Sequence, residues 1–298
     1  MQCDKCRREA IIFQPYSGRH LCKEHFLADA EAKAKRVIRS HQWLRPGDHV
    51  AVALSGDKKS SALLFFLKKL TGKRSDIRVS AIFIDEGIRG HHDSSRAREV
   101  ANALETECHT GSLQEEFGIT VDSLAKEKGC NSVCNWCRTL RDTLLMKIAS
   151  EKGATTIAKG RSLDENALST MEFMLQGEPE QLVTSCRGLQ NGISWIEPFS
   201  HIPADEVNLY ADLKGVGFPE SACSYGKTPL RQDVKILLEG YTASHPATRY
   251  AVANLGETLA GYTTPAGGKV LTCRQCGSVI SGTCRACEIR DGVKRRGP

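Results

Sequence analysis

The sequence predicts an α/β protein in which a parallel sheet carries helices on both faces, with a small zinc module at each end of the chain. Short apolar segments rich in β-branched residues alternate with segments of helical periodicity through the middle of the chain. Cysteines stand in close pairs near both ends. The 298 residues are 40% hydrophobic and 26% charged, which is typical of an ordinary globular protein.

The N-terminal module is expected in residues 1–27. A C-x2-C pair is followed there by C-x2-H, and the four candidate ligands are Cys3, Cys6, Cys22 and His25. Two close pairs of such ligands can surround one tetrahedral zinc ion. A segment so poor in apolar residues needs a metal to fold, so we expect a structural zinc site. Free buried thiols are the alternative.

A second zinc module is expected in residues 270–298, after a linker rich in glycine and proline at 263–269. Two C-x2-C pairs supply its four candidate ligands, which are Cys273, Cys276, Cys284 and Cys287. Basic residues crowd both modules and form either a solvated surface or a contact with a phosphate backbone.

Residues 28–262 are expected to form the central α/β domain. Strands are predicted at 49–54, 77–84 and 155–159, and helices at 60–70, 94–105, 138–152 and 163–175. Beyond residue 198 the pattern is mainly helical, with a proline near the start of each helix. Ligands of such folds bind beyond the carboxyl ends of the strands, so the loops at Ser55 and Gly160 are predicted to form the site.

The loop after the first of these strands reads "SGDKKS" from Ser55 to Ser60. An apolar strand precedes it and a helix of Leu and Phe follows. A turn between a strand and a helix N-terminus is a common place for phosphate groups to bind. The sequence therefore suggests a phosphate-binding turn.

Six cysteines lie within the central domain, where Cys108 and Cys186 are single and the other four are candidate ligands. These four are Cys130, Cys134, Cys137 and Cys223, and we expect Cys134 and Cys137 just before a helix that begins near Arg138. Three thiolates can hold a [4Fe-4S] cluster with one open iron. From spacing alone Cys130 could be a fourth ligand, or the group could be redox-active or merely buried.

Four longer stretches resemble the TtuA-type tRNA 2-thiolation enzymes. These stretches are residues 83–95, 163–182, 202–218 and 284–293. The resemblance runs from Cys3 to about Val293 and includes both cysteine-rich ends. That family belongs to the PP-loop ATP pyrophosphatases, with an adenine nucleotide alpha hydrolase-like fold. The resemblance implies that ATP adenylates a uridine carbonyl oxygen and that sulfur then replaces this oxygen, releasing AMP.

The resemblance also implies roles for individual residues. Cys134, Cys137 and Cys223 match the ligands of a [4Fe-4S] cluster whose open iron carries the incoming sulfur. Arg141 matches a catalytic basic position that could stabilise charge on phosphate, and Asp164 matches an acid that orients substrate or metal. On local grounds Arg141 could instead be a solvent-facing helix charge, and Asp164 a helix N-cap.

ATP with Mg is the cofactor that the resemblance implies, and the nucleotide is expected to lie along both predicted loops. The expected contacts are Ala53, Leu54, Ser55, Gly56, Lys58, Ser60, Ser61, Ile84, Asp85 and Gly160.

The phosphate turn departs from the family pattern, Ser-Gly-Gly-Lys-Asp-Ser, at two positions. Asp57 replaces the second glycine and Lys59 replaces the aspartate. At about 4 Å and an effective dielectric constant of about 20, a carboxylate facing a phosphate charge costs about 4 kcal/mol. Either Asp57 pairs with Lys59 and the turn still binds ATP, or Asp57 caps the following helix and phosphate binding has been lost. The family's usual His-Asn is also replaced, by Arg161 and Ser162.

The expected partners are tRNA, a ubiquitin-like thiocarboxylated sulfur carrier and a second copy of the chain. The net charge of +6 suits a polyanionic partner. No apolar run approaches the roughly 20 residues of a membrane helix, and the N-terminus does not read as a signal peptide, so we expect a cytoplasmic protein. Two alternatives remain open: a tRNA-binding or paralogue-binding protein with a decayed nucleotide loop, and a cluster-dependent sulfurtransferase that does not use ATP.

Overall fold

A six-stranded sheet forms the centre of the molecule. The computed structural model describes residues 1–90, 94–128, 130–177, 188–190, 192–219, 223–226, 228–262, 271–276, 279–280 and 283–294. In order across the sheet, the strands are β5 (Cys108–Ser112), β4 (Arg78–Asp85), β3 (His49–Ala53), β6 (Thr156–Ala158), β8 (Ile193–Ile196) and β7 (Gly188–Gln190). The first five run parallel, and β7 pairs antiparallel with β8 at the edge. The predicted parallel α/β sheet is confirmed.

The strand order reverses between β3 and β6. The chain steps outward from β3 to β4 and β5, then crosses back to β6 on the other side of β3 and continues to β8. At such a reversal the loops that leave the two central strands diverge and open a crevice at the carboxyl ends. The loops at Ser55 and Gly160 leave β3 and β6 at this point.

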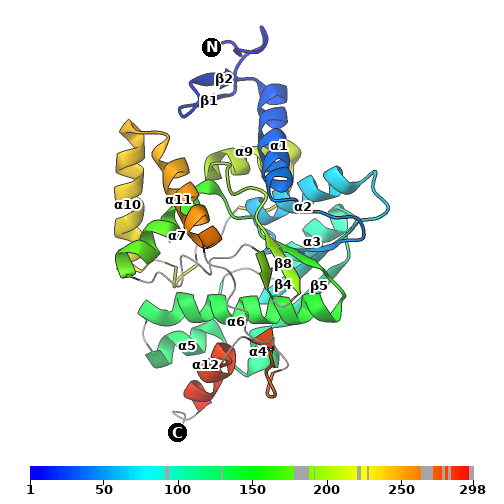
Figure 1. Ribbon diagram of the computed structural model, residues 1–298, viewed down its shortest axis with the longest axis vertical. Coiled ribbons are helices and arrows are strands. Elements are labelled where there is room, and N and C mark those ends of the chain that lie inside the picture. Colours follow the sequence, from blue (N-terminus) through cyan, green and yellow to red (C-terminus); the bar gives the residue numbers. More distant parts are fainter. Residues whose placement is uncertain are drawn as a thin grey trace.

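Two cores cover the two faces of the sheet, because successive strand residues point to opposite sides (Figure 1). Val50 and Val52 pack into one core and Ala51 into the other. The first core contains residues of α1 (Lys23–Ser40), α2 (Lys58–Thr71), α3 (Ser94–Ala103) and α9 (Ala204–Lys214). The second contains residues of α4 (Leu113–Phe117), α5 (Val121–Lys128), α6 (Cys130–Glu151) and α12 (Arg285–Lys294).

A third and smaller core joins three helices beside the sheet, which Figure 1 shows as a separate group. These helices are α7 (Leu163–Gln176), α10 (Pro229–Ser244) and α11 (Thr248–Tyr262). Leu163 and Ala167 of α7 are buried there against Leu238 and Ala253. The predicted helical character beyond residue 198 is confirmed.

The two terminal modules lie at opposite ends of the molecule (Figure 1). The first contains the hairpin of β1 (Ile12–Gln14) and β2 (Arg19–Leu21), and the second contains β9 (Leu271–Thr272), β10 (Val279–Ile280) and α12. Helix α1 runs on through residue 27, so the proposed boundary of the first module falls inside a helix. Cys273, Cys276 and Cys287 are buried in the core that α6 shares. The predicted linker at 263–269 lies outside the described residues.

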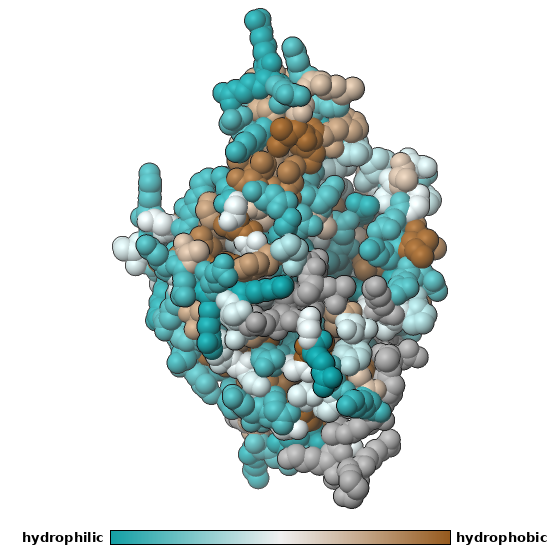
Figure 2. All heavy atoms as spheres, turned by 180° about the vertical axis from the view of Figure 1, so that it is seen from behind, coloured by the Kyte–Doolittle hydropathy of each residue, from teal (hydrophilic) through white to brown (hydrophobic). Residues whose placement is uncertain are grey.

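The surface seen from behind is largely hydrophilic, with one hydrophobic patch near the top of the view and smaller hydrophobic groups elsewhere (Figure 2). Within the described ranges, no helix combines the length and the apolar character needed to cross a membrane.

Close backbone packing fixes the turn after β3. Gly56 has a φ of +82°, and its carbonyl accepts a hydrogen bond from the Phe218 amide at 2.9 Å. Gly217, at a φ of +80°, has no room for a side chain, since a Cβ there would lie 2.8 Å from the Asp57 carbonyl oxygen. The segment after α9 therefore acts as a clamp on the turn.

Replacing Gly217 with alanine should lower the free energy of unfolding by about 1–3 kcal/mol, because the positive φ and the close backbone both disfavour a Cβ. Urea denaturation measures this change. Gly240→Ala is the matched control: a Cβ on this α10 residue would meet nothing within 4 Å. It should stabilise the protein by about 0.5–1 kcal/mol. Equal midpoints for Gly217→Ala and the natural protein would show that the clamp contributes nothing.

Candidate active site

A cavity of about 500 Å³ opens at the carboxyl ends of β3, β4 and β6. The turn after β3 and the turn after β6 form one side of it, and residues of α6, α7 and the segment before α10 form the other. Of the residues predicted to contact the nucleotide, those that line the cavity are Ala53, Leu54, Ser55, Ser60, Ile84 and Gly160.

The remaining predicted contacts lie outside the lining of this cavity. Lys58 extends away from it and pairs with Asp212 at 2.6 Å. Asp85 accepts a hydrogen bond from the Gly87 amide at 2.8 Å. Gly56 and Ser61 belong to the side of the turn that faces away from the cavity, where the Ser61 side chain is fully buried.

Asp57 caps helix α2. Its Oδ1 accepts a hydrogen bond from the Ser60 amide at 2.8 Å, and its backbone is extended. This is one of the two interpretations of the altered turn. The other, a local ion pair with Lys59, is not what the structure shows, because the Lys59 ammonium reaches Glu165 Oε1 at 2.8 Å. The Ser60 amide therefore donates to Asp57 and not to a phosphate group.

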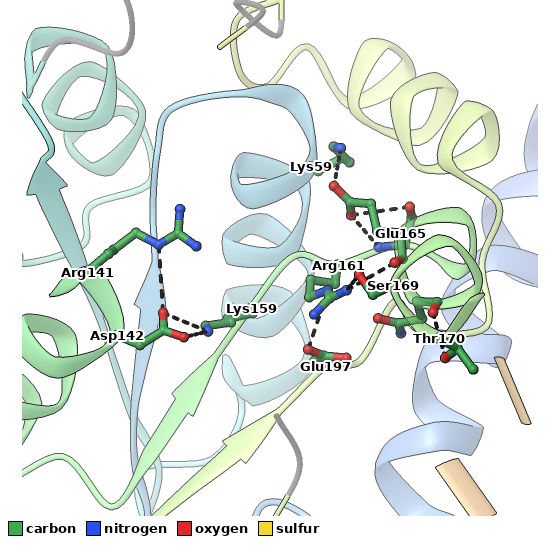
Figure 3. A network of polar contacts seen from close by, with 11 residues as sticks. Lys59, Arg141, Asp142, Lys159, Arg161, Glu165, Ser169, Thr170 and Glu197 are labelled. Carbon is green, nitrogen blue, oxygen red and sulfur yellow. Dashed lines mark hydrogen bonds and ion pairs between the residues drawn. The ribbon is translucent and has the colours of Figure 1, made fainter. Parts of the chain in front are cut away.

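Glu165, at the start of α7, links the two turns (Figure 3). Its Oε2 accepts from the Ser162 amide at 2.9 Å, so Ser162 and Glu165 form a capping box at the start of α7. Burial favours the neutral carboxyl, but Lys59 and Arg161 outweigh it and lower the pKa of Glu165. Glu165 is therefore an anion that faces the phosphate turn.

Arg161 lies in the turn after β6 and is held by α7 (Figure 3). Its guanidinium donates to Ser169 Oγ at 2.8 Å and to the Glu165 carbonyl at 3.0 Å. The preceding residue, Gly160, packs directly on the other turn, because a Cβ there would lie 2.9 Å from the Lys59 carbonyl oxygen. The two turns therefore touch through their backbones.

Arg141 faces the cavity from α6, with Asp142 and Lys159 beside it (Figure 3). Its Nη1 donates to Glu86 Oε1 at 2.9 Å, while Lys159 Nζ donates to both Asp142 oxygens at 2.9 Å. Burial would raise the pKa of Asp142, but Lys159 and Arg141 hold it below its usual value. The interpretation of Arg141 as a purely solvent-facing charge does not describe this arrangement.

Asp164 points away from the cavity. Its Oδ2 accepts from the Ala204 amide at 2.6 Å, and its Oδ1 pairs with Arg249 at 2.9 Å. The helix N-cap is Ser162, so the local alternative, Asp164 as the N-cap, does not describe this helix. The carboxylate that faces the phosphate turn is that of its neighbour Glu165, which was not predicted from the sequence.

Three of the central cysteines line the same cavity as the phosphate turn. Cys134 and Cys137 lie within α6, which begins at Cys130 and not near Arg138 as predicted, and they face one side because they are three residues apart. Cys223 joins them from the segment before α10. The Cys134 thiol donates to the Tyr225 carbonyl at 2.9 Å. The Cys130 side chain lies outside the described residues.

The three thiols of the cavity lie less close together than the ligands of the two terminal modules. Among the described residues, sets of candidate ligand atoms that all lie within 4.8 Å of one another occur at the two chain ends and not at this cavity. A four-iron cluster is wider than one ion, and three thiolates with an open position fit its chemistry. Burial, reinforced by Glu86, raises the pKa of Cys137.

Each terminal module brings its four predicted ligands together. Thiolates around a tetrahedral zinc ion stand about 3.8 Å apart, given Zn–S bonds of about 2.3 Å. Cys6 and Cys22 are 3.7 Å apart, and His25 Nδ1 lies 3.3 Å from Cys3 Sγ. In the C-terminal module the Cys273–Cys287 and Cys276–Cys284 sulfur distances are both 3.6 Å. Both sites fit one tetrahedral ion.

Several charged residues of the cavity were not predicted from the sequence. They are Glu86, Arg138, Lys159, Glu165, Glu172 and Arg231. Glu86 and Lys159 directly follow β4 and β6, so their positions at strand ends could have identified them. Glu172 and Arg231 pair at 2.6 Å between α7 and α10, a contact that only the tertiary structure creates.

A parallel sheet with a phosphate turn at its strand-order reversal defines an α/β protein of the nucleotide-binding type. Residues 27–235 match the family model of the PP-loop domain, and residues 2–27 match that of the N-terminal LIM domain of 2-thiouridine synthetase TtuA. The chain is 30% identical to the tRNA 2-thiolation protein NcsA of Haloferax volcanii, over 99% of both chains. It belongs to the PP-loop family, among the tRNA 2-thiolation proteins.

Two further similarities span nearly the whole chain. A cytoplasmic tRNA 2-thiolation protein 1 of Drosophila sechellia is 29% identical, over 98% of this chain and 87% of that protein. The solved structure of the U34-tRNA thiolase NcsA from Methanococcus maripaludis, with its [4Fe-4S] cluster, superposes with a TM-score of 0.85 at 23% identity. That superposition covers 98% of this chain and 96% of the other, so the two share one fold.

Proposed function

We propose that this protein is a tRNA sulfurtransferase that replaces the C2 carbonyl oxygen of a uridine with sulfur at the expense of ATP. One observation carries the proposal: the phosphate turn and three cysteines open into a single cavity. The names of its relatives, tRNA 2-thiolation proteins, support the same reaction. We take the nucleotide to be ATP because the domain is a PP-loop domain.

Positively charged side chains of the cavity lie where the nucleotide would react. In the proposed reaction the uridine oxygen attacks the α-phosphorus, pyrophosphate leaves, and the N3 proton is lost. Arg141, fixed by Glu86, and Lys159, fixed by Asp142, present cations that stabilise negative charge on phosphate. Their carboxylate partners hold them in place before substrate arrives.

Cys134, Cys137 and Cys223 are the proposed ligands of a [4Fe-4S] cluster. Such a cluster, held by three thiolates, supplies an iron to which sulfide can bind. The cysteines lie in the cavity that holds the phosphate turn, so sulfur would be delivered to the carbon that carries the leaving AMP. Proximity of this kind removes the entropic cost of bringing two reactants together.

We propose two structural zinc ions, one in each terminal module, because each module places four ligands at tetrahedral spacing. Metal analysis of the purified protein should find two zinc ions per chain, and Cys22→Ser should reduce this to one and destabilise the hairpin beside α1. Cys108→Ser, which alters a thiol of β5 away from both modules, should keep both ions. Full zinc content in Cys22→Ser would contradict the assignment.

The proposed partners are tRNA, a ubiquitin-like thiocarboxylated sulfur carrier and a second copy of the chain, in the cytoplasm. The net charge of +6 favours a polyanionic substrate. Three large apolar side chains are exposed on α10, which supports self-association: Ile236, Leu237 and Tyr241. Relatives named as cytoplasmic proteins support the location.

A second candidate is a tRNA-binding protein without nucleotide chemistry. The Asp57 cap favours it, because a carboxylate occupies part of the phosphate turn. Absence of ATP binding would support this candidate.

Cys223→Ser should abolish thiolation, since it removes one of three cluster ligands and leaves the phosphate turn intact. The cluster-reconstituted protein is incubated without oxygen with tRNA, ATP and sulfide, and 2-thiouridine is measured by mass spectrometry of the digested tRNA. Cys108→Ser should retain activity, because Cys108 lies outside the cavity lining. Full thiolation by Cys223→Ser would rule out the proposed ligand set, and absence of thiolation by the natural protein would rule out the function.

A further inference from the structure

We propose that this site binds the nucleotide phosphates without a divalent cation, and that the Lys59 ammonium takes the role that a magnesium ion would have. The proposal rests on the proposed function in one respect, that the cavity receives a nucleotide. It concerns whether the nucleotide binds alone or as its magnesium complex. The proposed reaction does not determine which of the two binds.

The carboxylates of the cavity are already engaged. Four line it: Asp57, Glu86, Glu165 and Glu172. Each holds a cation or an amide, in contacts of 2.6 to 2.9 Å with the Ser60 amide, Arg141, Lys59 and Arg231. Magnesium in a nucleotide site is usually bound through one or two carboxylates as well as the phosphates. Among the lining residues that the structure describes, a magnesium ion on a free oxygen of Asp57, Glu86 or Glu172 would lie beside a helix N-terminus or a bound guanidinium. The like charges would repel, so the residues present do not fit it.

The cavity is instead rich in cations. Six basic side chains line it: Lys59, Arg138, Arg141, Lys159, Arg161 and Arg231. They outnumber the four carboxylates of the lining by two, while Asp142 and Glu197, outside the lining, pair with Lys159 and Arg161. A polyphosphate brings several negative charges into the same space. Fixed side-chain cations can therefore neutralise charge that a magnesium ion would otherwise carry.

Of these cations, Lys59 is the one whose position best suits contact with a phosphate group. It stands in the first turn of α2, and its side chain is only 10% exposed. Its ammonium lies between the two turns that meet at the strand-order reversal, 2.8 Å from Glu165 (Figure 3). A lysine ammonium is a compact charge with three donors, so it can contact a phosphate oxygen and a carboxylate together.

Glu165 can share Lys59 with a phosphate at little cost. Only its Oε1 pairs with Lys59, while its Oε2 accepts from the amide and the hydroxyl of Ser162. The carboxylate therefore keeps its capping-box partners when Lys59 shifts toward an incoming phosphate. The Asp57 cap, which removes an amide from phosphate binding, makes this side-chain contact more important.

Calorimetry on the cluster-reconstituted protein tests the proposal, with ATP titrated in excess EDTA and, separately, in excess magnesium. We expect equal dissociation constants in the two titrations. Lys59→Met should weaken binding in EDTA by at least about tenfold, equivalent to about 1.4 kcal/mol. Lys147→Ala is the matched control, because it removes a lysine that pairs with Glu116 at 2.6 Å outside the cavity. It should bind ATP like the natural protein.

Lys59→Met alone leaves the buried Glu165 carboxylate without its cation, which disfavours folding. The double variant Lys59→Met with Glu165→Gln removes this problem, because it leaves no unpaired buried carboxylate. It should show the same loss as Lys59→Met, and normal ATP binding by it would overturn the proposal. Binding that needs magnesium would also overturn the proposal and leave the thiolation function standing. No binding in either titration would overturn it as well, and the thiolation assay on the same sample would then decide whether the proposed function fails too.

Discussion

Direct contact between backbones at the strand-order reversal is the constraint on which the rest of the site depends. Gly160 touches the carbonyl of Lys59, and Gly217 touches that of Asp57, so three segments distant in sequence meet at the turn after β3. A side chain at either glycine would separate them. This packing places the phosphate turn beside α6 and α7 and makes one cavity from residues that span Ala53 to Arg231.

Charge pairing then organises the cavity. Each acidic side chain that faces it is held by a cation or an amide, and basic side chains outnumber acidic ones among the lining residues, which favours an anionic ligand. The two changes in the phosphate turn belong to this arrangement. Asp57 caps the N-terminus of α2, and the Lys59 ammonium pairs with Glu165 at the start of α7. The altered turn is therefore tied into its surroundings by specific contacts.

Sequence reasoning predicted the architecture because periodicity and ligand spacing are local signals. The apolar strand before Ser55 and the cysteine pairs at both ends are confirmed as a strand and as two compact ligand sets. Strand β5, with the sequence CHTGS, gave no such signal, since it lacks the β-branched run of a buried strand. The start of α6 was misplaced because the cysteine-rich stretch before Arg138 has no apolar periodicity.

The direction of a side chain at a helix start is a tertiary property, and sequence reasoning failed there. Asp164 and Glu165 are adjacent in the first turn of α7, so they point to different neighbours: one to Arg249, the other to Lys59. Only the positions of α11 and α2 decide which of them faces the cavity. The pairing of Glu172 with Arg231 depends in the same way on how α7 and α10 pack.

A nucleotide and a cluster bound in one cavity should interact magnetically. Electron–nuclear double resonance on the reduced, cluster-reconstituted protein, with a non-hydrolysable ATP analogue bound, measures this interaction. We expect hyperfine coupling between the cluster spin and the phosphorus nuclei of the analogue, lost when the analogue is omitted. A reduced cluster with bound analogue but no phosphorus coupling would show that the two groups occupy separate sites.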